Sequence, residues 1–240
     1  MNRFKVLIII AIILFATGCS DYFMICSLNP FYLDKDVVLL HEIEGKWAAN
    51  PVPTKHKPDN KDNPTVWKQA DTTSFWKIER YMSKETVKTK SGKDSTVYKP
   101  MNGYRVKLIN SQTDSSIYEF QMVLFRVNNA LYADFMPEGH TGLENSQFAT
   151  ESYLKVHTLA RVAVRKKQLV VSWLGPDCVR DMIENKHVRL NFKWVASSSR
   201  LLLTGKSEQL TAMIDRYASE SRFIDWENQS AMLTLNRIKK

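Results

Sequence analysis

The side chains best suited to covalent chemistry in this sequence are its three cysteines, Cys19, Cys26 and Cys178. Cys178 follows Pro176 at the expected start of a helix, where the helix dipole can lower the pKa of a thiol and make it a nucleophile. No histidine partner for this thiol can be located in the sequence, so we expect a buried, unreactive Cys178. A Cys26–Cys178 disulfide would suit an oxidising compartment, and two separate thiols are the alternative.

Cys19 stands in a different context, at the end of a segment typical of protein export. Arg3 and Lys5 come first, an unbroken apolar run covers 6–16, and Gly18 immediately precedes Cys19. The run suits a signal peptide and is too short for a membrane-spanning helix, which needs about 20 residues. Two alternatives without a lipid are an uncleaved anchor helix and an ordinary signal peptide followed by a chance cysteine.

The residues Phe15-Ala16-Thr17-Gly18-Cys19 resemble the lipobox of bacterial lipoproteins, with Ala16 where a Leu is usual. The resemblance implies cleavage after Gly18 and acylation of the Cys19 thiol. Acyl chains on Cys19 would then hold the protein on a membrane of the bacterial cell envelope. Ser20 takes the position where an Asp would signal retention in the inner membrane, which favours the outer membrane.

The five histidines do not form a metal-binding or catalytic pattern. No two of them are separated by two to four residues, as a metal-binding helix requires. They are His41, His56, His140, His157 and His187. Gly-x-Ser-x-Gly, Cys-x-x-Cys and phosphate-binding glycine loops are also absent from the sequence. We therefore expect no metal, no cofactor and no enzymatic activity; an enzyme would have to use His140, His157 or Cys178.

The chain that must position these residues alternates apolar and polar side chains with the period of a β-strand. Residues 118–124, for example, place Tyr118, Phe120 and Met122 on one face. The same pattern covers 76–79, 104–108, 130–136, 158–165, 169–174 and 188–194. Asn128-Asn129 and Lys166-Lys167 are predicted turns, and 51–64 is a predicted loop. Apolar spacings of three and four predict helices over about 176–186 and 206–218.

Gly45-Lys46-Trp47 resembles the Gly-x-Trp opening of lipocalin-like β-barrels. In those barrels the glycine relieves backbone crowding and the tryptophan packs across the closed end, so the resemblance implies these roles for Gly45 and Trp47. Together with the leader and Leu201-Leu202-Leu203-Thr204, the motif is also similar to a group of uncharacterised bacterial lipoproteins, to which no activity is attached. The alternative is that Trp47 is a core aromatic residue of an unrelated sheet.

These observations predict a mainly β protein: an antiparallel curled sheet or a lipocalin-like barrel, with two short helices in its C-terminal part. The expected boundaries are a signal peptide over 1–18, a flexible leader over 19–36 and a single β-rich domain over 37–240.

The net charge is +9, and loss of Arg3 and Lys5 with the signal peptide leaves +7. A basic surface favours anionic partners such as lipid headgroups. The basic cluster Arg161, Arg165 and Lys166-Lys167 has its aromatic neighbours on the opposite face, so it lacks a stacking platform for nucleic acid. We expect this cluster to be solvated or to contact an anionic membrane.

Three classes of function are compatible with the sequence. The first is a membrane-anchored binding or interaction module, with a small apolar ligand or an envelope protein as its partner. The second is a structural or envelope-assembly lipoprotein that acts through a protein surface, and the third is an envelope enzyme. A cavity inside the barrel would favour an apolar ligand, whereas a packed interior would favour assembly.

Overall fold

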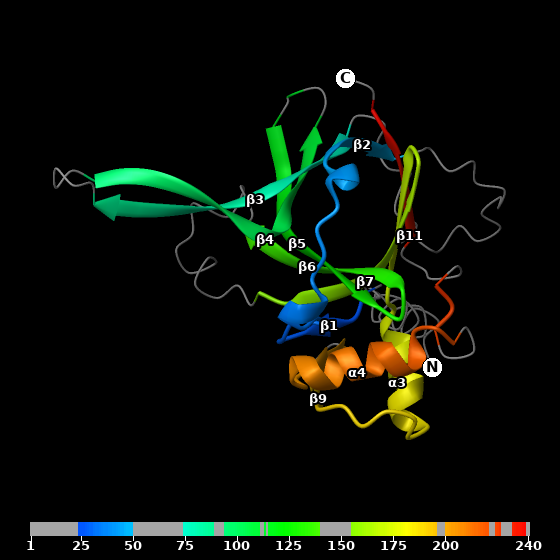
Figure 1. Ribbon diagram of the computed structural model, residues 1–240. Coiled ribbons are helices and arrows are strands. Elements are labelled where there is room, and N and C mark those ends of the chain that lie inside the picture. The colour runs from blue at the N-terminus through cyan, green and yellow to red at the C-terminus, as the bar shows by residue number, and fades with distance from the viewer. Residues whose placement is uncertain are drawn as a thin grey trace, which may run out of the picture.

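Eight antiparallel strands close into a barrel in the computed structural model, which describes residues 24–49, 74–88, 94–110, 113, 115–139, 155–195, 200–220, 224–226 and 232–238 (Figure 1). In ring order they are β2 (Gly45–Ala49), β3 (Ser74–Lys88), β4 (Asp94–Asn110), β5 (Ser115–Val127), β6 (Ala130–Gly139), β7 (His157–Arg165), β8 (Gln168–Trp173) and β11 (Met232–Arg237). Strand β11 pairs with both β8 and β2 and so completes the ring. The predicted antiparallel, lipocalin-like barrel is confirmed. The predicted signal segment, with Gly18 and Cys19, lies outside the described residues.

The alternation of the strands decides which side chains fill the barrel. On β5, Phe120 is paired with Val106 of β4, and Met122 is paired with Phe135 of β6, so all four share the inner face. We call this apolar interior the inner core, and its largest fully buried members include Trp47, Tyr104, Ile43, Ile78 and Leu124. Each strand therefore has one buried and one wetter face, as the period of two requires.

Two of the predicted turns are present. Asn128 and Asn129 connect β5 to β6 with φ angles of 49° and 62°. Positive φ at both central residues is the geometry of a type I′ hairpin turn, which asparagine tolerates better than most residues. Lys166, between β7 and β8, likewise has a φ of 45°.

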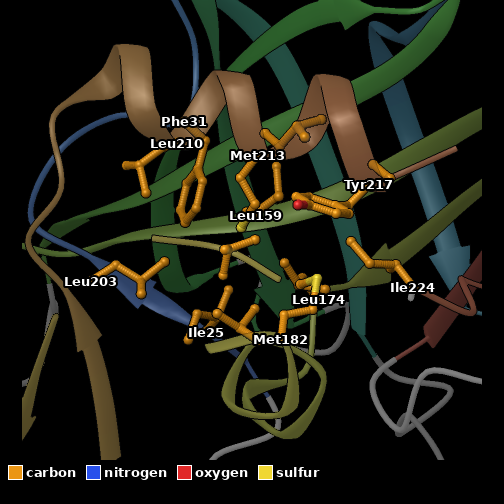
Figure 2. Close-up of a cluster of buried hydrophobic side chains, with 14 of the residues drawn as sticks. Ile25, Phe31, Leu159, Leu174, Met182, Leu203, Leu210, Met213, Tyr217 and Ile224 are labelled. Carbon is orange, nitrogen blue, oxygen red and sulfur yellow. The ribbon is translucent and has the colours of Figure 1, made fainter. Parts of the chain in front are cut away.

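A second apolar cluster, the outer core, lies outside the barrel wall (Figure 2). The wall contributes Phe125, Tyr132 and Leu159 from β5, β6 and β7. Two helices cover it, α3 (Pro176–Glu184) and α4 (Ser207–Tyr217), close to the predicted ranges. Helix α4 buries its apolar stripe of Leu210, Met213, Ile214 and Tyr217 against this wall.

Three short strands extend the sheet from β7 and form what we call the side sheet. They are β1 (Cys26–Ser27), β10 (Arg200–Leu203) and β9 (Phe192–Val195), in that order. Strand β1 pairs antiparallel with β7 and parallel with β10. The predicted strand over 188–194 is thus a strand only from Phe192 onward.

The segment predicted to be a flexible leader, 19–36, is packed into the fold from Met24 on. Ile25 and Phe31 are both 0% exposed and belong to the outer core. After them come two short 3-10 helices, η1 (Asp34–Asp36) and η2 (His41–Ile43), before β2 begins. The buried apolar side chains of this segment hold it in the fold, because they belong to the same core as the wall and the two helices.

Strands β3 and β4 continue well beyond the barrel as a two-stranded arm (Figure 1). Among the described residues, 82–88 pair with 94–100 alone. The pairing of β2 with β3 does not extend beyond Ile78, and the pairing of β5 with β4 begins at Tyr104. A bulge between Arg80 and Met82 marks the point where the arm leaves the ring. In Figure 1 the arm projects to the left of the barrel, whereas α3, α4 and β9 lie below it.

Candidate functional site

The Gly-x-Trp motif lies at the end of the barrel that η2 covers. Trp47 is fully buried, and its indole N–H donates to the carbonyl oxygen of Ile43 at 2.7 Å. Gly45 has a φ of +133°, which residues with a Cβ rarely adopt. A Cβ built on Gly45 would also lie 3.3 Å from the guanidinium of Arg237. Both residues therefore serve the packing of the closed end.

Arg237 of β11 seals this end in a way that sequence reasoning missed. Its guanidinium lies over the Trp47 ring, 5.3 Å from the centroid. The same group donates to the carbonyl oxygens of Glu42 at 2.9 Å and Glu44 at 2.6 Å. These two hydrogen bonds join the last barrel strand to the segment before β2. No spacing in the sequence signals this contact, because the partners are 193 and 195 positions apart.

Three aromatic rings on the inner side of the barrel pack against one another. Trp76, Phe135 and Trp173, from β3, β6 and β8, lie with ring centroids 5.7–6.1 Å apart. Their tilted and edge-to-face arrangement is the one that aromatic pairs prefer. Toward the other end of the barrel, Tyr118 and Phe120 lie 6.5 Å apart, and Tyr118 is exposed.

Two hollows in the described part of the chain are partly open to solvent. One, of about 300 Å³, lies between the start of β6 and the end of β7, and Leu40, Arg126 and Arg161 line it. The other, of about 370 Å³, lies between η1 and α4. Neither is an enclosed apolar chamber of the kind that surrounds a small ligand.

His157, one of the residues that an enzyme would have to use, lies in a buried polar cluster. Its Nδ1 is 2.6 Å from the carboxylate of Asp134, which is only 2% exposed. Strand pairing places Ser27 directly across from His157. The three residue types of a Ser-His-Asp triad are thus neighbours here, which no sequence motif predicted.

The environment of Ser27 argues against nucleophilic catalysis by this cluster. Ser27 is 0% exposed, and its hydroxyl accepts a hydrogen bond from the backbone N–H of Asn29 at 3.2 Å and lies 3.4 Å from the carbonyl oxygen of Leu203. A substrate carbonyl cannot reach a hydroxyl that is enclosed in this way. Asp134 also accepts the backbone N–H of Phe31 at 2.8 Å, so the cluster fastens the N-terminal segment to the barrel wall.

Cys178 is poorly suited to act as a nucleophile. Burial raises the pKa of its thiol to about 11, and the carboxylate of Asp181 adds to the shift. Desolvation therefore outweighs the helix start, which would lower the pKa. Cys26 and Cys178 are both thiols, with no disulfide between them.

The other histidines do not gather around a common centre. His41 is on the surface, 3.1 Å from Glu44, and the backbone carbonyl of His187 accepts the hydroxyl of Tyr217. His56 and His140 lie outside the described residues. Within the described ranges, no three His, Cys, Asp or Glu side chains are arranged to hold a metal ion.

The basic cluster that the sequence singled out lies at the end of β7 and in the turn to β8. Its four side chains are all exposed; they are Arg161, Arg165, Lys166 and Lys167. The aromatic ring opposite Arg161 across the strands, Tyr132, is buried in the outer core. The cluster therefore offers cations to solvent without rings on which bases could stack.

No protein-family model, curated protein or solved structure matches this chain. Among the described residues, no helix is long and apolar enough to span a membrane.

Proposed function

We propose that this protein is a membrane-anchored lipoprotein of the bacterial cell envelope that works as an interaction module, binding an envelope protein through its outer surface. The anchor rests on the lipobox-like residues that end in Gly18-Cys19. The choice of a protein surface over an internal ligand rests on the interior of the barrel. Its strands turn apolar side chains inward, and the rings of Trp76, Phe135 and Trp173 pack against one another there.

The observation that carries the proposal is the projecting arm. An isolated two-stranded ribbon is at best marginally stable in water, so an arm of this length is better explained by a partner that covers it. Among the described residues, each arm strand is paired on one edge, and its other edge can pair with another extended chain. Three large apolar side chains on it are well exposed: Met82 at 40%, Val97 at 38% and Met101 at 42%.

The base of the arm is braced against the barrel, so the arm is presented in a fixed direction. Tyr81 donates from its hydroxyl to the carboxylate of Glu138 at 2.8 Å. Arg105 donates twice to the same carboxylate, at 3.0 and 3.1 Å, and its guanidinium lies over the Tyr81 ring. Such a paired contact fixes geometry as well as adding energy.

The charge of the arm indicates the kind of partner. Residues 82–101 contain five lysines and two acidic residues, a net charge of +3. A protein with an acidic surface beside an extended apolar segment would complement both the charge and the free strand edges.

The anchor is tested separately from the arm. Metabolic labelling with a fatty-acid analogue should mark the wild-type protein and leave Cys19→Ala unmarked. Label that persists in Cys19→Ala, or an uncut N-terminus in the mass spectrum, would contradict the anchor.

The arm is tested by cross-linking in the native envelope. A variant in which residues 83–99 are replaced by Asn-Gly keeps the barrel and removes the arm. We expect it to keep the near-ultraviolet circular dichroism of the folded barrel and to lose the cross-linked partner. Because this variant changes the hairpin, the combined substitution of Met82, Val97 and Met101 by serine provides a milder second test. Partners captured equally by wild type and both variants would rule out the arm as the binding surface.

An apolar ligand at the barrel mouth is the second candidate, favoured by one observation. Tyr118 faces the interior near the open end and is 40% exposed, so its ring can be reached there. Native mass spectrometry of protein from its own envelope distinguishes the two candidates. A co-purified small apolar molecule supports a ligand at the barrel mouth. The mass of the protein without a bound small molecule, together with a stoichiometric protein partner, supports binding through the arm.

A further inference from the structure

The proposed anchor places a strict limit on how far the fold can stand from the membrane. Cys19 is five residues before Met24, the first described residue, and seven before Cys26 of β1. A chain spans at most about 3.6 Å per residue, so Met24 lies within about 18 Å of the acylated Cys19, and Cys26 within about 25 Å. Whatever path these residues take, β1 must lie close to the lipid surface.

Strand β1 does not stand alone, because the side sheet continues from it. Cys26 is in register with Leu202 of β10, and Leu202 with Lys193 of β9. Neighbouring strands are about 4.8 Å apart, so the backbone of Lys193 is about 10 Å from that of Cys26. The short tether that restrains β1 therefore restrains the whole side sheet.

The side sheet has one face turned into the outer core and one turned away from it. Ser27 and Leu203 are 0% exposed and define the inner face. Because they are paired in register, Cys26, Leu202 and Lys193 share the opposite face, and Leu28 follows directly after the end of β1. Leu28 is 40% exposed and Lys193 is also exposed, so this part of the side sheet presents an apolar side chain and a cation to its surroundings.

Trp194 of the outer strand belongs to the other face of the side sheet. It is paired with Leu201 of the outer core, and the guanidinium of Arg180 from α3 lies 5.6 Å from its ring. The outward face therefore depends on Lys193 and not on its aromatic neighbour.

We propose that this outward face of the side sheet, with Lys193 and the adjacent Leu28, rests on the phospholipid headgroups of the membrane that holds the Cys19 acyl chains. The inference depends on the proposed anchor. Lys193 contacts headgroup phosphates, and Leu28 enters the interface beside them. In the eight-stranded ring β3 stands opposite β7, and the wall formed by β3 is therefore the one turned away from the lipid.

A spin-label experiment on the full-length, acylated protein tests this orientation. The protein, carrying Cys26→Ser and Cys178→Ala, is reconstituted into vesicles of phosphatidylethanolamine and phosphatidylglycerol. A nitroxide is attached at Lys193→Cys or Leu28→Cys. The matched control is Lys77→Cys, an exposed lysine on the outside of β3. We expect collisions with a water-soluble nickel complex to be several-fold fewer at 193 and 28 than at 77, and collisions with oxygen to be more frequent.

The outcomes separate this inference from the proposed anchor. Protein that floats with the vesicles while the labels at 193 and 77 collide equally with nickel would overturn the orientation and leave the anchor intact. Protein that does not float would overturn the anchor itself.

Discussion

The inner and outer cores of this protein are both apolar but are assembled differently along the chain. The inner core collects alternate residues from strands that follow one another, such as Met122 on β5 and Phe135 on β6. The outer core joins Ile25 and Phe31, near the start of the described chain, to α3 and α4, more than 140 positions later. A core made of neighbouring strands can be recognised from local pattern, whereas one made of distant segments cannot.

The largest expected effect tests the inner core at its closed end. Trp47→Ala should lower the free energy of unfolding by about 3–5 kcal/mol, because it leaves a cavity and removes the ring beneath Arg237. Trp47→Phe is the matched control; it keeps a ring but loses the hydrogen bond to Ile43, so we expect a loss of about 1–2 kcal/mol. Urea denaturation measures both. A midpoint unchanged in Trp47→Ala would mean that this end does not stabilise the barrel.

The outer core should respond to Met213→Ala with a loss of about 3 kcal/mol. Glu208→Ala, on the exposed face of the same helix, should change stability by less than about 0.5 kcal/mol. Hydrogen exchange sharpens the comparison: we expect amides of α4 and β1 to exchange faster in Met213→Ala while those of β2 and β3 stay protected. Equal acceleration in β2 and β3 would show that the two cores open as one unit.

A smaller effect concerns the polar contact that fastens the N-terminal segment. Asp134→Asn cannot accept both the Phe31 N–H and the His157 ring N–H, so we expect a loss of about 2 kcal/mol. Exchange of the Phe31 amide should rise more than that of the Tyr132 amide on the neighbouring wall. If the Phe31 amide stays protected from exchange in Asp134→Asn, the hydrogen bond to Asp134 does not hold the N-terminal segment on the barrel wall.

The smallest effect is kinetic rather than energetic. With a thiol pKa of about 11, Cys178 should be alkylated slowly at pH 8, where about one thiol in a thousand is ionised, and about tenfold faster for each unit of pH up to 11. Mass spectrometry of iodoacetamide-treated protein in a Cys26→Ser background measures the rate. If the alkylation rate instead stops rising near pH 8, the Cys178 thiol is not desolvated in the outer core. The Met213→Ala variant, with a loosened outer core, should react faster.

The contrast between the cores also explains how far sequence reasoning reached. Alternation located most strands, the asparagine pair located one hairpin turn, and apolar spacing located both helices within two residues of their observed ends. Each of these signals is local, since it depends on residues within a few positions of one another.

What the sequence did not reveal depends on partners far apart in the chain. Arg237 resembles any C-terminal cation until it lies over Trp47, and Asp134 resembles any outward-facing strand residue until the N-terminal segment covers it. The buried cluster of Ser27, Asp134 and His157 likewise exists only after β1 has paired with β7. The packed N-terminal segment was expected to be a flexible leader for the same reason: its apolar residues have no periodic pattern and find their core only in three dimensions.

The seam between β2 and β11 determines the order in which this barrel can form. Strands β2 to β8 follow the ring in chain order, so each can pair with its predecessor as soon as it is available. The ring itself closes only when Leu235 and Arg237 reach β2. Closing so long a loop has a large entropic cost before any contact repays it, and such pairings form slowly. Until β11 pairs, the sheet therefore remains open and curved, with β2 at one edge and β8 at the other, and these two edges are exposed to incorrect pairing for as long as β11 is missing.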